Sequence, residues 1–212
     1  MTPSGTSGAT LTRLDPATRA LVRAAAAVSA AGEEHVRTEL QSAASVTPHD
    51  WVEELLLQTY LFAGFPRALN AMREWRRLAP RRALVEAAPT QAEIRARGEA
   101  TCARVYGGMY ERLRVNVRDL HPLLDDWMVE EGYGKVLGRP ALDLPRRELC
   151  IVAACAASAQ DRQLLSHLHG AVNVGVEPRA VTETLDAIAD LVAAPAMTRA
   201  RGLWDRIRHD VH

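Results

Sequence analysis

The 212-residue chain has no net charge, because 26 Lys and Arg residues balance 26 Asp and Glu residues. Without a basic excess, we expect no electrostatic attraction to nucleic acid. Lysine is almost absent, Lys135 being the only one, and we assign no function to that bias. No apolar run is long enough to cross a membrane. With 48% hydrophobic residues, the chain is predicted to form a medium-sized globular body that has neither nucleic acid nor membrane as a partner.

Cysteine is also scarce. Cys102, Cys150 and Cys155 form no C-x-x-C pair, which argues against a disulfide framework and a zinc knuckle. We expect them to be small core residues. The first residues are rich in Ser, Thr and Gly, with neither a basic start nor an apolar segment, so residues 1–11 are predicted to be a disordered tail and not a signal peptide. The protein is therefore expected to be cytoplasmic.

No alternating strand pattern occurs, and the predicted fold class is all-α. Asp15 followed by Pro16 combines an N-cap with proline at the first helical position, and Thr47-Pro48 repeats this signal. Gly32 and Gly64 end the corresponding helices. The predicted helices span residues 16–31, 48–63, 66–78, 92–105, 122–131, 145–157 and 161–175, with others from 110, 178 and 195. A connection is expected between Pro80 and Pro89, and a loop or short turn over residues 132–140.

The sequence also repeats itself without a gap when the chain is shifted by 129 residues. The shift superposes Pro16 on Pro145, Val52 on Val181, Glu54 on Glu183, Leu56 on Leu185, Pro66 on Pro195, Ala71 on Ala200 and Trp75 on Trp204. We interpret this as two copies of one helical unit, related by a pseudo-twofold axis and burying faces against each other. The division is a tail (1–11), a degenerate first copy (12–80), a helical connection with the start of the second unit (81–138) and a second copy (139–212).

The two copies differ at two positions that bear on chemistry. Glu148 and His167 of the second copy correspond to Arg19 and Thr38 of the first. Neither an arginine nor a threonine acts as a general acid or base near neutral pH. A candidate active site is therefore expected in the second copy.

The segment from Tyr133 to Gly175 resembles the carboxymuconolactone decarboxylase family, which lies in the alkylhydroperoxidase D-like superfamily. Its motifs are Gly-Arg-Pro-Ala-Leu-Asp-Leu, Arg-Glu-Leu around Glu148, and Gln-Leu-Leu-Ser-His ending at His167. Together with Ala-Gly-Phe-Pro at 63–66, the resemblance covers roughly residues 12–208. It implies an all-helical bundle and assembly as a homotrimer (pseudo-hexamer) or hexamer.

The resemblance also suggests two enzyme activities. In the alkylhydroperoxidase D branch, the Glu148-to-His167 spacing would place the two motif cysteines at Gln160 and Gln163, and an amide is neither nucleophile nor redox centre. An alkylhydroperoxidase-like antioxidant protein would therefore need the chain's cysteines in some displaced arrangement. The preferred prediction is a lyase that decarboxylates a small carboxylated lactone, or a related acid from aromatic breakdown, without cofactor or metal.

Decarboxylation needs an oxyanion partner, an orienting cation and a proton donor for the carbanion. We assign His167 as the proton donor, because its ordinary pKa lies nearest to working pH. Glu148 either orients the imidazole or shuttles the proton itself. The predicted substrate-binding residues are Arg139 for a carboxylate, Gln163 for the oxyanion, and Tyr133 and Trp127 as pocket wall or hydroxyl donor.

Each assignment has a structural alternative. His167 can be a satisfied core histidine, and Glu148 can pair with Arg146, Arg147 or a neighbouring helix. Arg139 can fix a loop, and Tyr133 and Trp127 can simply pack. His167 and His169 do not form a metal pair, since residues two apart on a helix point about 200° apart. A noncatalytic oligomeric protein that binds a small molecule also remains open.

Overall fold

The computed structural model describes residues 10–79 and 88–210, and in these ranges every regular element is a helix. The predicted all-α class is therefore confirmed. Leu11, placed in the tail by the sequence analysis, forms an isolated bridge with Val176: its amide donates to the Gly175 carbonyl, and its own carbonyl accepts from the Glu177 amide. The rest of the predicted tail up to residue 9, and most of the predicted connection between Pro80 and Pro89, lie outside the described residues.

The helices follow one another with short connections. Those before the connection are α1 (Pro16–Ala30), α2 (Glu33–Val46), α3 (His49–Ala63) and α4 (Phe65–Leu78). Those after it are α5 (Gln91–Tyr106), the 3-10 turn η1 (Gly107–Met109), α6 (Tyr110–Leu120), α7 (Pro122–Trp127), the π-helix η2 (Met128–Leu137), α8 (Leu144–Ala157), α9 (Asp161–Asn173), α10 (Pro178–Ala187) and α11 (Ala194–Asp210). None of the helices found in the described ranges is both long and apolar enough to span a bilayer.

Several helix starts are set by local side chains, as predicted. The Asp15 carboxylate accepts from the Thr18 amide and caps α1, with Pro16 at the first position. Asp143 caps α8 in the same way by accepting from the Arg146 amide. An acceptor at the N-cap satisfies an amide that has no partner within the helix.

Three expectations need correction. The sequence analysis named no helix between Gly32 and Thr47, where α2 lies. Thr47 is not an N-cap, because its hydroxyl donates to the Ala17 carbonyl and α3 begins one residue after Pro48. Residues 132–137 are not a loop but the second half of the π-helix, which continues directly from α7.

Glycines explain how this π-helix is held in place. A Cβ on Gly98 of α5 would lie 2.1 Å from the Val129 carbonyl oxygen, and one on Gly134 would lie 2.4 Å from the Ile94 carbonyl oxygen. The two backbones therefore approach more closely than any side chain would permit. Gly132 and Gly134 predict a loop from the sequence, but close packing against α5 makes this segment helical.

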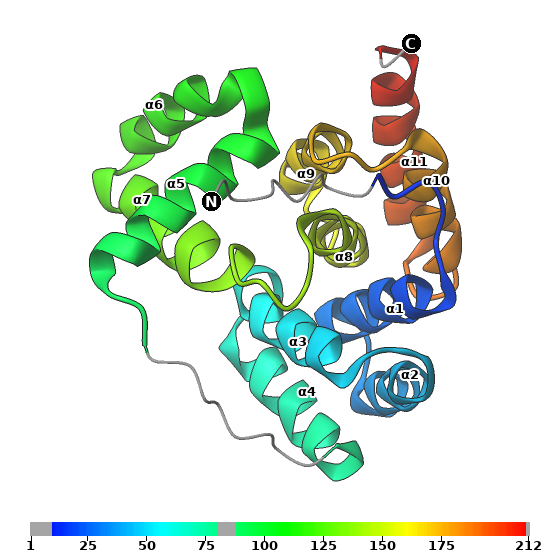
Figure 1. The fold of residues 1–212 in the computed structure, drawn as a ribbon. Coiled ribbons are helices and arrows are strands. Elements are labelled where there is room, and N and C mark those ends of the chain that lie inside the picture. The colour runs from blue at the N-terminus through cyan, green and yellow to red at the C-terminus, as the bar shows by residue number, and fades with distance from the viewer. Residues whose placement is uncertain (1–9, 80–87, 211–212) are drawn as a thin grey trace, which may run out of the picture.

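Helix α8 occupies the centre of the molecule, with α1, α3 and α9 packed around it and α5 to α7 forming a separate group to one side (Figure 1). Nearly every residue of α8 from Leu144 to Ala156 is buried. A helix that is apolar on all sides is one that the fold encloses. The side chains of Arg147 and Glu148 are therefore held inside the protein.

Candidate functional site

Two neighbouring helices bring Glu148 and His167 together. Nδ1 of His167 on α9 lies 2.8 Å from Oε2 of Glu148 on α8. The Glu148 side chain is fully buried, and only 6% of His167 is exposed. Because Nδ1 is occupied by the carboxylate, the imidazole presents Nε2 to any other partner. The pair predicted from the sequence is thus a hydrogen-bonded carboxylate–imidazole couple.

The surroundings of the pair fix its position. A Cβ on Gly170 would lie 2.6 Å from Oε2 of Glu148, so the glycine leaves the space that the carboxylate occupies. The ring of Phe62 on α3 meets the His167 ring edge to face, with centroids 5.5 Å apart. The other carboxylate oxygen, Oε1, is buried without a hydrogen-bond partner in the described structure. Among the described residues, the hydrogen-bond partner of this carboxylate is therefore His167.

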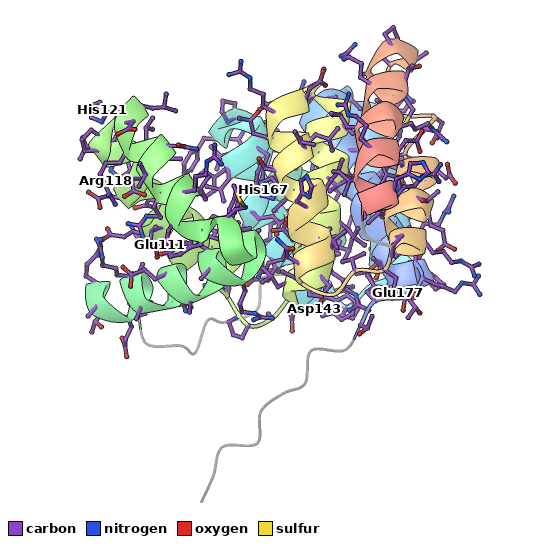
Figure 2. All side chains as sticks on the ribbon, turned by 90° about the horizontal axis from the view of Figure 1, so that it is seen from above. Glu111, Arg118, His121, Asp143, His167 and Glu177 are labelled. Atoms are coloured by element: carbon purple, nitrogen blue, oxygen red, sulfur yellow. The ribbon has the colours of Figure 1, made fainter. Side chains whose placement is uncertain are left out.

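His167 lies at the wall of a cavity of about 870 Å³ between α9 and the group formed by α5, α7 and the π-helix, with α3 and the start of α4 completing it (Figure 2). Tyr133 and Trp127 also line this cavity. Three of the predicted site residues thus share one pocket, and this size is typical of small-molecule sites. Glu148 does not line it and reaches the cavity only through the imidazole.

Two tyrosine hydroxyls belong to the same cavity. The rings of Tyr106 and Tyr133 meet edge to face, with centroids 6.1 Å apart. Burial raises the pKa of Tyr106 to about 12. Burial also raises the pKa of Tyr133 well above its ordinary value, and nearby Tyr106 and Glu148 add to the effect. Both hydroxyls therefore stay protonated at neutral pH. The two hydroxyls also hydrogen-bond to each other, so one proton of the pair is left to donate to an oxygen in the cavity.

Arg139 and Gln163 lie elsewhere. Nε of Arg139 donates to both carboxylate oxygens of Glu54, at 2.9 and 3.0 Å, and Arg139 does not line the cavity. Gln163 is exposed and also lies outside the cavity lining. The structure therefore does not bring these two side chains to His167. Arg139 instead takes the arrangement of its structural alternative, an arginine that anchors its segment.

The arginines beside Glu148 have other partners. Arg147 is fully buried and donates to Glu54 Oε2 at 2.8 Å and to Gln58 Oε1 at 3.1 Å, both on α3. Arg146 donates to Asp15 and Asp143. The structural alternative in which Glu148 pairs with one of these arginines is therefore wrong. The Glu148 carboxylate contacts His167 instead.

The cysteines are core residues, as expected. Cys102, Cys150 and Cys155 are free and buried, and burial raises the pKa of each thiol to about 12. Because only the thiolate is nucleophilic, these thiols are unreactive at neutral pH. No cluster of three or more His, Cys, Asp or Glu residues suited to a metal ion occurs in the ranges that the structure describes.

The sequence analysis missed three residues of the site. Tyr106 is the one aromatic residue of α5, and Phe62 lies in the apolar run at the end of α3, so neither gives a local signal of function. Gly170 was noted only as a neighbour of His167, although its missing side chain makes room for Glu148. All three are recognisable only from contacts between helices.

The fold and the site define an all-helical protein in which a buried carboxylate–imidazole pair serves an apolar cavity. Residues 122–206 match the model of the carboxymuconolactone decarboxylase family, and this segment contains both Glu148 and His167. The resemblance identified from the sequence is thereby confirmed. The first copy, residues 12–80, lies outside the matched segment.

One relative is "Peroxisomal protein 2" of Schizosaccharomyces pombe, which is 28% identical over 128 residues. The aligned region covers 58% of this chain and 60% of the relative. The chain thus spans about three fifths of the length of the curated relative that it matches.

Proposed function

We propose that the protein is a cofactor-independent acid–base enzyme, a lyase of the carboxymuconolactone decarboxylase type, with His167 as the proton donor. The observation that carries this proposal is the 2.8 Å contact between His167 and buried Glu148 at the wall of a cavity. A carboxylate on one ring nitrogen stabilises the imidazolium and aligns the other nitrogen with the bound molecule. A core histidine with no function needs no cavity beside it.

The proposed reaction starts from a carboxylate placed next to a carbonyl-conjugated carbon. The carbon–carboxylate bond breaks, carbon dioxide leaves, and the electron pair delocalises onto the carbonyl oxygen. The protonated His167 then gives its Nε2 proton to the carbon, and the neutral imidazole recovers a proton from solvent. The net change is one carboxylate and one proton converted into a C–H bond and carbon dioxide. Glu148 stabilises the imidazolium throughout.

The developing oxyanion needs a hydrogen-bond donor, and the tyrosines of the cavity replace Gln163 in that role in the proposal. The Tyr106 and Tyr133 hydroxyls stay protonated because burial raises their pKa values. A neutral hydroxyl aimed at a forming negative charge stabilises it most in a site that excludes water. No arginine is among the described residues that line this cavity, so loss of the substrate carboxylate would also relieve an unfavourably solvated charge.

Two other functions are weaker. An antioxidant peroxidase would need a reactive thiolate, and all three thiols have raised pKa values and are buried. A noncatalytic binding protein would use the cavity but not the proton couple. Glu148→Gln and His167→Asn would then leave ligand affinity and every phenotype unchanged.

We also propose that the chain consists of two copies related by a pseudo-twofold axis. This is supported by the order of the helices, since α1 to α4 and α8 to α11 begin at positions that differ by about the same 129 residues. Reciprocal contacts support it too: α3 packs on α8 while α10 packs on α1. The Glu54 carboxylate accepts from Arg139, which lies just before α8. The equivalent Glu183 carboxylate accepts from the amide of Leu14, which lies just before α1.

The assembly and location remain proposals as well. Large apolar side chains stand exposed outside the lining of the cavity, Leu120 at 77% and Leu69 at 52%, and a homotrimer or hexamer would cover such surfaces. Sedimentation of the purified protein tests this. We propose a cytoplasmic location, whereas the yeast relative is named as peroxisomal.

The direct test of the reaction is release of carbon dioxide by the purified protein. Two substrates are compared: 4-carboxymuconolactone, which is small and not aromatic, and 3,4-dihydrocoumarin-3-carboxylate, whose lactone is fused to an aromatic ring. Turnover of either one supports the lyase. Absence of turnover with both, in protein that is folded and binds a ligand in the cavity, would contradict it.

A further inference from the structure

Aromatic residues are scarce in the chain but concentrated at the cavity. The sequence contains two Phe, four Tyr and four Trp residues. Both phenylalanines, three of the tyrosines and one tryptophan line the cavity of His167: Tyr60, Phe62, Phe65, Tyr106, Trp127 and Tyr133. The core, by contrast, consists mainly of alanine, valine and leucine. Tyr133 belongs to this core, and Tyr60, Phe62 and Tyr106 pack against it, whereas Phe65 and Trp127 do neither. Packing of the core therefore does not account for these two rings at the cavity.

The outermost rings are poorly covered by protein. Phe65 is 62% exposed and Trp127 is 55% exposed, although both lie at the cavity. Phe62 and Tyr133 lie deeper, Phe62 against His167 and Tyr133 against Tyr106. Rings thus continue from the mouth of the cavity to the imidazole. Large apolar surfaces left open in this way indicate a binding surface.

The charge of the lining points to the same conclusion. None of the described residues that line the cavity is Arg or Lys, although the chain contains 26 such residues. The one carboxylate among them, Glu131, is paired with Lys135 one helical turn away. A small molecule with two carboxylates would find no bidentate partner here. A flat apolar molecule would find ring faces and edges along the whole cavity.

We propose that the substrate is a planar aromatic molecule, carrying a carbonyl oxygen and at most one carboxylate, whose rings lie among these aromatic side chains with the reacting carbon at His167. This inference rests on the proposed function, because the proton couple sets which end of the molecule reacts. A cavity of about 870 Å³ holds a fused two-ring molecule with space to spare.

The test is a binding measurement with two probes of the same skeleton. Coumarin is a planar aromatic lactone, and octahydrocoumarin is its saturated, puckered counterpart. Titration calorimetry on the full-length protein is expected to give about tenfold tighter binding of coumarin. 4-Carboxymuconolactone, the small diacid, is expected to bind more weakly than coumarin. Equal affinity for the two skeletons, no binding of coumarin, or tighter binding of the diacid would each overturn the proposal.

Two tryptophan variants locate the bound probe. Trp127→Leu is expected to weaken coumarin binding about fivefold, because one ring face is lost. Trp51→Leu is the matched control: Trp51 lies under the Arg146 guanidinium, 4.5 Å from the ring centroid, and does not line this cavity. Thermal unfolding of both variants checks that each is folded. Equal loss of affinity in the two variants would contradict binding in this cavity.

The outcomes also separate this inference from the proposed function. Turnover of the small diacid together with weak coumarin binding would leave the lyase standing and overturn the aromatic substrate. Selective binding of coumarin with no decarboxylation of either substrate would overturn the lyase and leave the preference for a planar aromatic ligand standing.

Discussion

Gly170 and Glu148 occupy adjoining space on facing helices: a methyl group on the glycine would lie 2.6 Å from the carboxylate oxygen that holds His167. Glycine within a helix lowers stability by about 0.5–1 kcal/mol relative to alanine. Gly170 therefore lowers the stability of helix α9, but its missing side chain makes room for the Glu148 carboxylate.

The first prediction follows from this contact. In Gly170→Ala the new methyl group displaces the Glu148 carboxylate and misaligns the imidazole. We expect turnover to fall about 10- to 100-fold, with the helix content retained in circular dichroism. Gly202→Ala is the control, since Gly202 lies on α11 with nothing near its missing Cβ. Full activity in Gly170→Ala would show that the glycine does not position the carboxylate.

A second prediction concerns the close packing of α5 on the π-helix. Gly98→Ala places a Cβ 2.1 Å from the Val129 carbonyl oxygen, and backbone cannot yield as a side chain does. We expect a loss of about 1–3 kcal/mol in the free energy of unfolding, typical of overpacking, measured by urea denaturation. Gly202→Ala is exposed in mid-helix and is expected to gain about 0.5–1 kcal/mol. A Gly98→Ala variant with the same free energy of unfolding as wild type would contradict the close approach of the two backbones.

The buried pair of Arg147 and Glu54 provides a third prediction. Arg147→Met leaves the Glu54 carboxylate, itself only 4% exposed, with Arg139 alone and removes the bond to Gln58. Breaking a buried pair from one side costs about 3–5 kcal/mol. The double variant with Glu54→Gln, which removes the uncompensated charge, is expected to recover part of this loss in the same denaturation experiment. A single variant as stable as wild type would contradict the role of the pair.

The fourth prediction is a dependence of stability on alkaline pH. The pKa of Cys102, Cys150 and Cys155 is raised by burial to about 12, from an ordinary 9.0. Between these values the unfolded chain releases protons that the folded protein keeps, so the free energy of unfolding falls as pH rises from 9 towards 12. Replacing all three residues by alanine is expected to flatten this slope. A thiol reagent should also react with the native protein at pH 8 only as fast as it unfolds.

The sequence predicted the helices that carry local start signals and missed those that depend on distant contacts. Asp15 and Asp143 predict the starts of α1 and α8, because an N-cap side chain bonds to the first turn of its own helix. The π-helix has no such local signal, since Gly134 allows close packing against Ile94 of α5, which lies 40 residues earlier in the chain. Helix α2 has no capping side chain at Gly32 that would mark its start.

The same distinction applies to the site. Glu148 and His167 are predictable from the sequence, because they differ from Arg19 and Thr38 of the first copy and lie in the motifs that carry the family resemblance. No local pattern links Arg139 to its partner Glu54, which lies 85 residues away, so this pairing is visible only in the structure. Tyr106 and Phe62 reach the cavity from α5 and α3 and were recognised only in the structure.

The most direct test of the account is the rate of carbon dioxide release by wild type, His167→Asn and His169→Asn with a substrate that wild type turns over. His169 is the matched control, because it lies on the same helix but is exposed and outside the cavity of His167. We predict that His167→Asn loses at least about 100-fold in rate, as expected for removal of a general acid, while His169→Asn keeps the wild-type rate. An active His167→Asn, or an equal loss in both variants, would contradict His167 as the proton donor.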